Sequence, residues 1–409
     1  MAVKQIDANG VKQLLREARK LFLQGMSGDP RALHAIIRDD PGTASHLSIL
    51  TSFVSGINQF DCDLLGNAAH LSGFFPAPTK GFDGYRQIVS SYFGVTDFVR
   101  EFAADTVFIP VSSPNRNGMV TPGISAEFVE ASLDMASQRV AIISRSMPVL
   151  AHNASLSLER FSHAFVDDTP PLSLPAASAA PDPVSDAITG HLARLIGDNA
   201  TLQIGIGRVP GRLFLKLTKH RNLRIHSGLI SGEIRTLVEA GALDPDIPMS
   251  CATVMGSADF YRWLDGREDF RLYPIQDTHN PSTLAKIDGL ITVNSAIEVD
   301  LLGQVNAEKA GDYFVSAAGG LPDFSAAGHR SPGGCSIIAL PATNTSGTRS
   351  RIVPRLASDT PVTVPRTDVD FVVTEYGIAR LIGKTPDECA RALASIAVPD
   401  ARPTLDRYC

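Results

Sequence analysis

Short, nearly continuous apolar runs recur along this chain, and the segments between them place their apolar residues at helical spacing. Residues 106–110 and 140–144 form such runs in the first half, and residues 123–138 show the helical pattern. The second half repeats the arrangement, with runs at residues 223–226, 290–293, 336–340 and 371–374. Apolar strands that alternate with helical segments are typical of open, largely parallel sheets covered by helices on both faces. The pattern therefore predicts an α/β fold.

The length and one proline-rich segment divide the chain. With 409 residues it is long for a single core and fits two domains of roughly 200 residues each. Five prolines among small residues lie within residues 167–184, where they exclude both a continuous helix and a central strand. The sequence predicts an amino-terminal α/β domain over residues 1–175, a linker over residues 176–184 and a carboxyl-terminal α/β domain over residues 185–409.

Charge and cysteine usage narrow the class of protein. The formal net charge is -6, and lysines and arginines are scattered singly, so the chain shows no basic surface for nucleic acid. Its five cysteines are far apart and show neither metal-ligand spacing nor a disulfide framework, which suits a reducing compartment and predicts no metal. The first residues lack a signal-peptide core, and no apolar run is long enough for a membrane span. We therefore expect a cytoplasmic protein that binds neither nucleic acid nor membrane.

A glycine-rich loop lies between an expected strand and an expected helix. Gly205 and Gly207 follow the apolar residues 201–204 and precede a helical pattern that starts near Gly211. Glycines let the backbone approach a ligand closely, and the start of a helix presents free N–H groups to an anion. The spacing lacks the third glycine of a dinucleotide-binding loop and the lysine of a P-loop. The loop is therefore either a site for another anionic ligand or an ordinary structural turn.

Six strings follow one another along the chain, at residues 202–210, 224–233, 293–306, 319–324, 350–355 and 372–377. In this order they resemble the acetyl-CoA hydrolase/transferase family, which includes 4-hydroxybutyrate and acetate CoA-transferases. The resemblance covers nearly the whole chain but is weak before Thr106. It implies two similar open α/β domains of the CoA-transferase type with the active site between them, and a faint echo of residues 108–120 in residues 290–305 fits two similar halves.

The same resemblance implies the ligands and the assembly. Coenzyme A would enter as an acyl-CoA substrate, together with an acceptor molecule. Relatives are usually oligomeric, so we expect a homodimer or a higher homo-oligomer. The acyl group, the acceptor and the pathway are not specified by the sequence.

The string around His226 departs from the family at one position. Most relatives carry a nucleophilic glutamate two residues after this histidine, and here that position is Gly228. The family's glutamate attacks the acyl-CoA carbonyl, passes through a mixed anhydride and becomes a glutamyl-CoA thioester, which glycine cannot do. The resemblance thus implies an acyl-CoA-processing enzyme, a thioester hydrolase or an acyl or CoA transferase, that works without this intermediate.

Two alternatives to this interpretation stay open. Glu233 could reach back into the site as a displaced carboxylate and keep a conventional CoA-transferase mechanism, although it stands five residues further along. The chain could instead bind CoA esters without turning them over. His226 itself is expected to be a hydrogen-bonded histidine at a strand end.

Further site positions are carried over from the matched strings. Asn280 matches an asparagine that holds substrate oxygen in the family, and Gly319 and Gly320 match paired glycines whose N–H groups can stabilise an oxyanion. Glu375 matches a glutamate near the family's catalytic centre. Ordinary roles compete with these, because Asn-Pro is a common turn former and a carboxylate at a strand end is commonly solvated.

The last candidates are two arginines and three residues of uncertain chemistry. Arg330 and Arg351 are expected to bind phosphate or carboxylate groups of CoA, with a solvated surface position as the alternative. Cys335 stands where lysine is common in the family, and a packed thiol is expected there rather than a nucleophile. Glu298 and Asp300 are two residues apart in an extended string, and we expect them to support the site rather than react.

Overall fold

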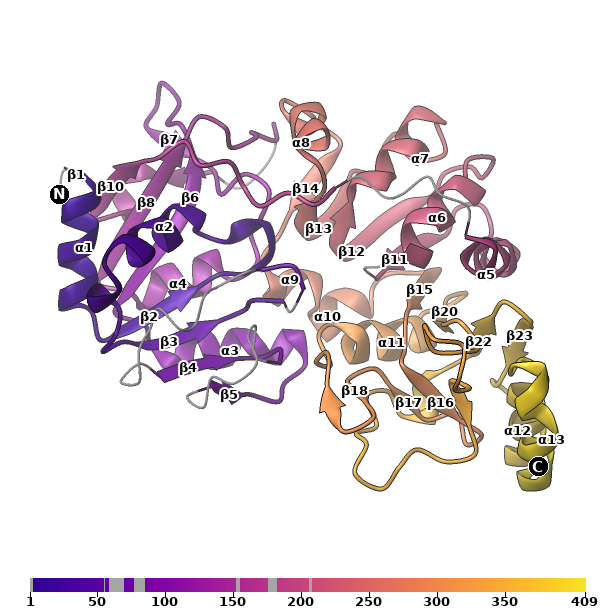
Figure 1. Ribbon diagram of the computed structural model, residues 1–409. Coiled ribbons are helices and arrows are strands. Elements are labelled where there is room, and N and C mark those ends of the chain that lie inside the picture. Colours follow the sequence, from indigo (N-terminus) through magenta and orange to yellow (C-terminus); the bar gives the residue numbers. More distant parts are fainter. Residues whose placement is uncertain are drawn as a thin grey trace. The chain divides into compact units, whose positions relative to one another are not determined.

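The computed structural model describes residues 3–54, 56–58, 70–76, 85–151, 155–175, 182–205 and 208–409. The chain forms two compact units, of which unit 1 consists of Met1–Pro175 and Ser250–Asp277, and unit 2 of Ala176–Met249 and Thr278–Cys409 (Figure 1). Most of the predicted linker, residues 176–181, lies outside the described residues, and so does Gly207.

Unit 1 is built on an eight-stranded sheet in which all neighbouring strands are parallel. Its strand order is β1 (Lys4–Ile6), β10 (His163–Val166), β8 (Gln138–Ser144), β6 (Thr106–Ser112), β2 (Lys20–Leu23), β3 (Ser48–Thr51), β4 (His70–Gly73) and β5 (Tyr85–Gln87). The helices are α1 (Ala8–Glu17), α2 (Arg31–Asp39), α3 (Tyr92–Phe102) and α4 (Val129–Met135).

The alternation of side chains along β2 shows how this sheet is covered. Leu21 and Leu23 belong to an apolar cluster with α1 and α2, whereas Phe22 between them belongs to a cluster with α3 and α4. Successive side chains of a strand point to opposite faces, so the two helix pairs cover opposite faces of the sheet. A continuous apolar strand is the sequence signal of this arrangement.

The segment from Ser250 to Asp277 joins unit 1 although it lies late in the sequence. It contains most of β13 (Met249–Met255), α8 (Ala258–Leu264), β14 (Phe270–Leu272) and the start of α9 (Ile275–Thr278). The amide of Ala126 donates to the carbonyl of Ala252, and the amide of Val254 donates to the carbonyl of Ile124. The sequence-based division placed this segment in the carboxyl-terminal half, because such long-range backbone pairings leave no local pattern.

Unit 2 contains five parallel strands in the order β12 (Arg224–Ser231), β11 (Thr201–Ile204), β15 (Leu290–Asn294), β20 (Cys335–Ala339) and β22 (Phe371–Thr374). An antiparallel strand, β23 (Gly377–Arg380), follows β22 at the edge. Its helices are α5 (Pro183–Ala193), α6 (Arg208–Lys216), α7 (Arg235–Glu239), α10 (Pro281–Leu284), α11 (Leu321–Arg330), α12 (Pro386–Ser395) and α13 (Arg402–Leu405).

Smaller elements complete both units. A three-stranded sheet of unit 2 joins β17 (Val305–Asn306), β16 (Glu298–Asp300) and β21 (Ile352–Val353). Two-stranded pairs are β18 (Lys309–Ala310) with β19 (Tyr313–Phe314), and β7 (Met119–Val120) with β9 (Leu156–Ser157). Short 3-10 helices include η5 (Gly232–Ile234), which directly follows β12.

The two units share a strand order. The spatial order is β3-β2-β6-β8-β10 in unit 1 and β12-β11-β15-β20-β22 in unit 2. In both units the earliest of these five strands, β2 or β11, has the next one, β3 or β12, on one side. The three later strands lie on its other side, in chain order. Strands β6 and β15 hold the same place, and they carry the faint sequence echo noted above. The predicted α/β class with two similar halves is confirmed.

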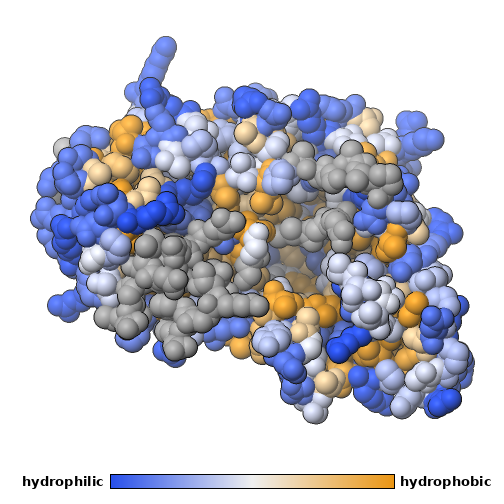
Figure 2. Space-filling model, in the orientation of Figure 1, coloured by the Kyte–Doolittle hydropathy of each residue, from blue (hydrophilic) through white to orange (hydrophobic). Residues whose placement is uncertain are grey.

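The surface in Figure 2 is mostly hydrophilic, with smaller apolar areas that include the region of β18. Tyr313, Phe314 and Val315, in and after β19, are among the exposed apolar side chains. Within the described residues, no helix is long and apolar enough to cross a membrane.

Candidate active site

The carboxyl edge of the unit 2 sheet brings several of the matched strings together. Leu202 of β11 pairs with Ile225 of β12, and Ile204 pairs with Val293 of β15. By this register Gly228 lies level with Gly205, just beyond the end of β11, and with Asn294 at the end of β15. Open α/β sheets bind their ligands at this edge, because the loops that follow the strands meet there.

Strand β12 presents different residues to its two faces. A Cβ atom added to Gly228 would meet the ring of Phe324, on α11, at 3.7 Å, so Gly228 faces α11. The alternate residues Ile225, Ser227, Leu229 and Ser231 line a pocket with Phe214 of α6 and so face the other way, and Ile230 also reaches this pocket near the end of the strand. This is the period of two expected for an extended strand.

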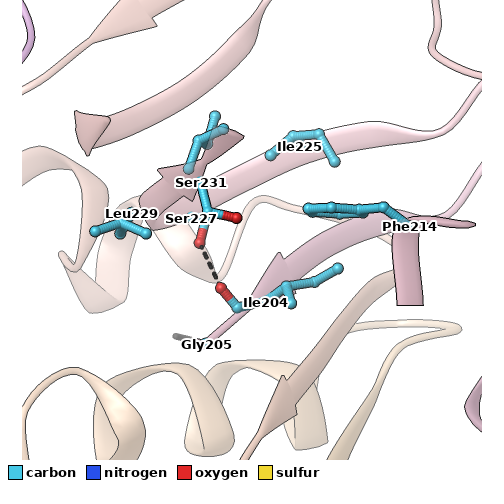
Figure 3. A pocket seen from close by; sticks show the side chains of 8 residues that line it. Ile204, Gly205, Phe214, Ile225, Ser227, Leu229 and Ser231 are labelled. Carbon is cyan, nitrogen blue, oxygen red and sulfur yellow. Dashed lines mark hydrogen bonds between the residues drawn. The ribbon is translucent and has the colours of Figure 1, made fainter. Parts of the chain in front are cut away.

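The pocket on the α6 face is small and mainly apolar (Figure 3). Ser227 lies between Leu229 and Phe214 in this view, and its hydroxyl donates a hydrogen bond of 3.3 Å to the carbonyl of Ile204. Gly205 lies at the end of β11 beside it, which places the described part of the glycine-rich loop next to this pocket. The hydroxyl of Ser227 therefore already has an acceptor within the sheet.

On the α11 face, the ring of His279 occupies the space next to Gly228. A Cβ atom added to Gly228 would lie 2.8 Å from Cε1 and 2.9 Å from Nε2 of this ring. A Cβ atom added to Gly320 would lie 2.6 Å from Nε2 and 2.9 Å from Cδ2. His279 is 2% exposed, so the ring is enclosed between the two glycines and their neighbours. Two glycines from different strings of the sequence thus accommodate one imidazole.

The partners of this ring also fix a second histidine. The Nδ1 atom of His279 lies 2.9 Å from the hydroxyl oxygen of Thr278. The carbonyl of Thr278 accepts a hydrogen bond of 2.9 Å from Nε2 of His226, and because a carbonyl only accepts, that nitrogen carries the proton. The ring of Phe324 packs edge-on against both histidines, with ring centres 4.7 Å from His279 and 6.4 Å from His226.

Burial keeps both histidines uncharged at neutral pH. It lowers the pKa of His279 to about 3, with a smaller contribution from the nearby His226. It also lowers the pKa of His226, which the hydrogen bond to Thr278 only partly offsets. An imidazolium would lose its hydration in this environment, so the neutral form is favoured. The α11 side of the site therefore presents neutral rings beside Gly228.

The start of α11 supplies backbone donors close to His279. Gly319 has a φ of 56°, in the left-handed region that favours glycine, and Gly320 is the N-cap residue directly before the helix begins at Leu321. In the first turn of the helix, the N–H of Leu321 donates a hydrogen bond of 3.3 Å to the carbonyl of Ala318, and Pro322 has no N–H. The candidate donors for negative charge are therefore the backbone N–H groups of Gly319 and Gly320, directly before the helix. Gly320 touches His279, so these donors lie beside Gly228 and near Asn280, the next residue in the chain.

Asn280 has a structural function in this arrangement. Its side-chain oxygen accepts a hydrogen bond of 2.8 Å from the amide of Ser282 and caps α10. This is the ordinary turn chemistry considered for an Asn-Pro pair. The cap uses the oxygen of the side chain, and the amide group is the part that could contact a substrate.

The carboxylate of Glu233 lies on the opposite side of β12 from His279. Glu233 is in η5, and a Cβ atom added to Gly211 of α6 would lie 3.2 Å from its Cγ and 3.3 Å from its Cδ. Helix α6 covers the face to which Ser227 and Leu229 point. Glu233 therefore packs against α6 rather than beside Gly228.

Glu375 and Arg330 lie further from Gly228, whereas Arg351 lies beside the segment that follows β15. Glu375 follows β22, four strands from β12, which corresponds to about 19 Å across the sheet. Its carboxylate accepts a hydrogen bond of 2.8 Å from the amide of Ala342. Arg330 ends α11, about 15 Å along the helix from Gly320, and pairs with Asp368 at 3.3 Å. Arg351 lies 3.5 Å from the carbonyl of Ala296.

The remaining candidates have packing or turn functions. Burial raises the pKa of the Cys335 thiol to about 12, so it is a poor nucleophile at neutral pH. Asp300 is 1% exposed and accepts hydrogen bonds from the amides of Leu302 and Gln304, which fixes the turn after β16. Among the described residues, no group of three or more His, Cys, Asp or Glu side chains could hold a metal ion.

Sequence reasoning did not single out His279. It appears only as the residue before Asn280 in a string chosen for the asparagine. The glycines at positions 228 and 320 were the available sequence signal for this ring, because a residue without a side chain leaves room for a neighbouring one. Only the structure shows that both make room for the same ring.

Comparison with known proteins identifies the family to which this chain belongs. Residues 256–409 match the family described as acetyl-CoA hydrolase/transferase C-terminal domain. The chain is 34% identical over 312 residues to 4-hydroxybutyrate coenzyme A transferase of Clostridium kluyveri, covering 75% of this chain and 72% of that protein. It is 30% identical over 327 residues to succinyl-CoA:cyclohexane-1-carboxylate CoA transferase of Geobacter metallireducens, covering 78% and 74%.

The fold is shared with a solved structure as well. RipA from Yersinia pestis superposes with a TM-score of 0.88 at 24% sequence identity, covering 99% of this chain and 96% of that one. The chain belongs to the acetyl-CoA hydrolase/transferase family, whose enzymes act on CoA thioesters. The resemblance inferred from the six strings is confirmed at the level of the family.

Proposed function

We propose that this chain processes acyl-CoA thioesters by direct attack of an acceptor on the thioester, without a glutamyl-CoA intermediate. The observation that carries the proposal is Gly228, which stands where the family resemblance calls for a nucleophilic glutamate. The ring of His279, which burial keeps neutral, occupies the space beside it. A covalent acyl or CoA intermediate on residue 228 is therefore chemically impossible.

The proposed reaction has one displacement at the acyl carbon. Oxygen of water or of an alcohol, or nitrogen of an amine, forms a bond to the carbonyl carbon, and the carbon–sulfur bond breaks. Coenzyme A leaves as a thiolate and takes up the proton that the acceptor loses. The products are free CoA and an acid, an ester or an amide, depending on the acceptor.

The start of α11 is the part of the site that would stabilise this transition state. Negative charge develops on the carbonyl oxygen, and the proposed donors are the N–H groups of Gly319 and Gly320, which directly precede the first residue of α11. The amide group of Asn280, with its oxygen used as the cap of α10, is the third proposed donor. We assign no role at the acyl carbon to Glu375, which lies four strands away.

CoA itself would be held by several groups of this unit. Gly205 and Gly207, Arg351 and Arg330 remain the proposed contacts, and the position of Arg330 at the far end of α11 suits the phosphate end of CoA better than its thioester. A homodimer or a higher homo-oligomer is the proposed assembly. The acceptor and the acyl group are left to experiment.

A conventional transferase that uses Glu233 is the alternative. The packing of Glu233 against Gly211, on the α6 face of β12, favours direct attack over this route. A glutamyl adduct at Glu233 would nevertheless be decisive evidence for it. Borohydride reduction during turnover, followed by peptide mass spectrometry, distinguishes the two mechanisms, because only the thioester adduct is reduced to a stable label.

The first experiment incubates the purified protein with a panel of acyl-CoAs, in water alone and then with carboxylate, amine and alcohol acceptors. Mass spectrometry that detects free CoA or a new acyl product, with no labelled glutamate, is the expected result. A label on Glu233 would replace direct attack with the displaced-carboxylate mechanism. Thioesters that remain unchanged yet raise the melting temperature would identify a CoA-ester-binding protein without turnover.

A further inference from the structure

The ring of His279 is held from several sides, which limits how far it can move. Its Nδ1 atom has Thr278 as a partner, Phe324 packs against its face, and the backbone at Gly228 and Gly320 borders its other edge. Contacts below 3.0 Å from a Cβ atom require a neighbour to shift, and a ring with 2% exposure has little free space. A side chain at residue 228 and an imidazole at residue 279 therefore compete for one volume.

We propose that His279 is the specificity-determining residue of this site, because its ring takes the space that a side chain at position 228 needs and thereby commits the site to direct attack. The commitment to direct attack rests on the proposed function. The steric competition between the ring and a side chain at position 228 does not depend on that function. Gly228, His279 and Gly320 form a coupled cluster, in which each glycine is required by the ring. Replacing Gly228 alone is then not enough to restore a carboxylate mechanism.

The coupling also gives His279 a positioning role. The ring lies between β12 at Gly228 and Gly320, the N-cap residue of α11, so its size sets the spacing between the strand and the backbone donors that precede the helix. An acyl group bound beside Gly228 would be polarised by those donors. His279 therefore acts on the thioester through the position of the α11 amino terminus.

A double-mutant cycle tests the steric coupling without any substrate. In the parent chain, Gly228→Ala should lower the melting temperature by about 3 to 10 °C, because a methyl group is forced into the ring. In the His279→Ala background the same substitution should cause little further loss, since the ring is gone. An equal loss in both backgrounds, or no loss in the parent chain, would overturn the inference.

Gly190 supplies a matched control in the same unit. It lies in α5, and a Cβ atom added there would meet no other atom within 4 Å. Gly190→Ala should leave the melting temperature unchanged or slightly higher, and its effect should be the same in the parent chain and in the His279→Ala background. A Gly190 effect that differs between the two backgrounds would mean that the His279→Ala variant is generally perturbed, and the coupling would not be accepted.

The chemical part uses Gly228→Glu with and without His279→Ala. We expect the double variant to form a borohydride-reducible glutamyl-CoA adduct at residue 228 and to transfer CoA to acetate at least tenfold faster than Gly228→Glu alone. Equal adduct formation in both backgrounds would overturn the specificity role. Thermal coupling without an adduct in either background would uphold the steric cluster and overturn the specificity role, whereas the proposed function is overturned separately, by a labelled Glu233 or unchanged thioesters in the acyl-CoA panel.

Discussion

Each unit buries a titratable side chain, and in both cases burial shifts the pKa so as to favour the uncharged form. In unit 1, burial raises the pKa of Glu127 to about 7, and the group is 1% exposed. In unit 2, burial lowers the pKa of His279 to about 3. The two units share a strand order, so the different surroundings of Glu127 and His279 are not explained by the arrangement of the strands.

The surroundings of the two groups differ in kind. Glu127 accepts hydrogen bonds from the hydroxyls of Tyr92 at 2.7 Å and Ser125 at 3.1 Å, so side chains satisfy it within the core. His279 instead borders the backbone at two glycines, next to helix donors and Asn280. Glu127 is hydrogen-bonded to other side chains of the core, so we expect it to contribute to stability. His279 borders the backbone of two glycines at the candidate site, so we expect it to influence a bound ligand. Substitutions should therefore affect stability at Glu127 and turnover near His279.

The largest effect is expected from Asn280→Asp. The aspartate keeps the oxygen that caps α10 but loses the amide donor proposed to face the thioester oxygen. Turnover should fall about 100-fold, the range found when one oxyanion donor is removed, with an unchanged melting temperature. Steady-state assays with the acyl-CoA identified in the panel would measure this. Unaltered turnover would remove Asn280 from the site and weaken the contrast between the units.

The next effect is on stability, at Glu127. Glu127→Ala leaves the hydroxyls of Tyr92 and Ser125 without their acceptor and creates a cavity, which should cost about 2 to 4 kcal/mol of unfolding free energy. Denaturant unfolding would measure the loss. Glu127→Gln, of nearly the same size, should cost less than half as much. If the two variants were equally destabilised, the carboxyl hydrogen bonds would not be the cause.

The pH dependence of stability should have opposite signs in the two units. The folded pKa of Glu127, about 7, lies above its ordinary value of 4.5, so the folded state holds more protons there and stability is lost as pH rises from about 4.5 to 7. The folded pKa of His279, about 3, lies below its ordinary value of 6.5, so stability is lost as pH falls from 6.5 towards 3.

Two variants separate these contributions. Glu127→Gln should remove the loss on the neutral side, and His279→Gln should reduce the loss on the acid side, to which His226 with its lowered pKa also contributes. Each effect would be measured as unfolding free energy over a pH series. Both groups are buried, so the changes should amount to a few kcal/mol. The same slope in a variant as in the parent chain would show that another group titrates in that range.

The smallest effect is expected at Cys335. Its thiol is half-buried at the start of β20, and burial raises its pKa to about 12. Cys335→Ser should change turnover less than twofold, because a protonated thiol contributes no nucleophile. A loss of activity of tenfold or more would identify Cys335 as the missing nucleophile and reopen the mechanism.

Local patterns of the sequence predicted the fold well. Continuous apolar runs located β6, β8, β15, β20 and β22, because buried parallel strands need apolar residues on both faces. The proline-rich segment marked the point at which the chain first passes from unit 1 to unit 2. The return of residues 250–277 to unit 1 was not predictable, since it depends on backbone pairing of Val254 with Ile124 across more than a hundred residues of chain.

The candidate site was predicted less completely. Motif order identified Gly228, Gly320 and Asn280, and the structure gives them a common neighbour in His279. The cap formed by Asn280 also followed from its position before a proline. Sequence spacing does not determine side-chain directions. It therefore did not predict that Glu375 accepts a hydrogen bond from Ala342 or that Glu233 packs against α6.

The alternation of faces along β12 restricts how this part of the gene can change. A strand that gains or loses one residue before Gly228 turns every later side chain to the other face. Ser227 or Leu229 would then point at the ring of His279, where even a methyl group has no room, and Gly228 would leave a gap beside Phe214. We therefore expect homologues that keep the histidine to conserve the length of this strand more strictly than the identity of its outward-facing residues.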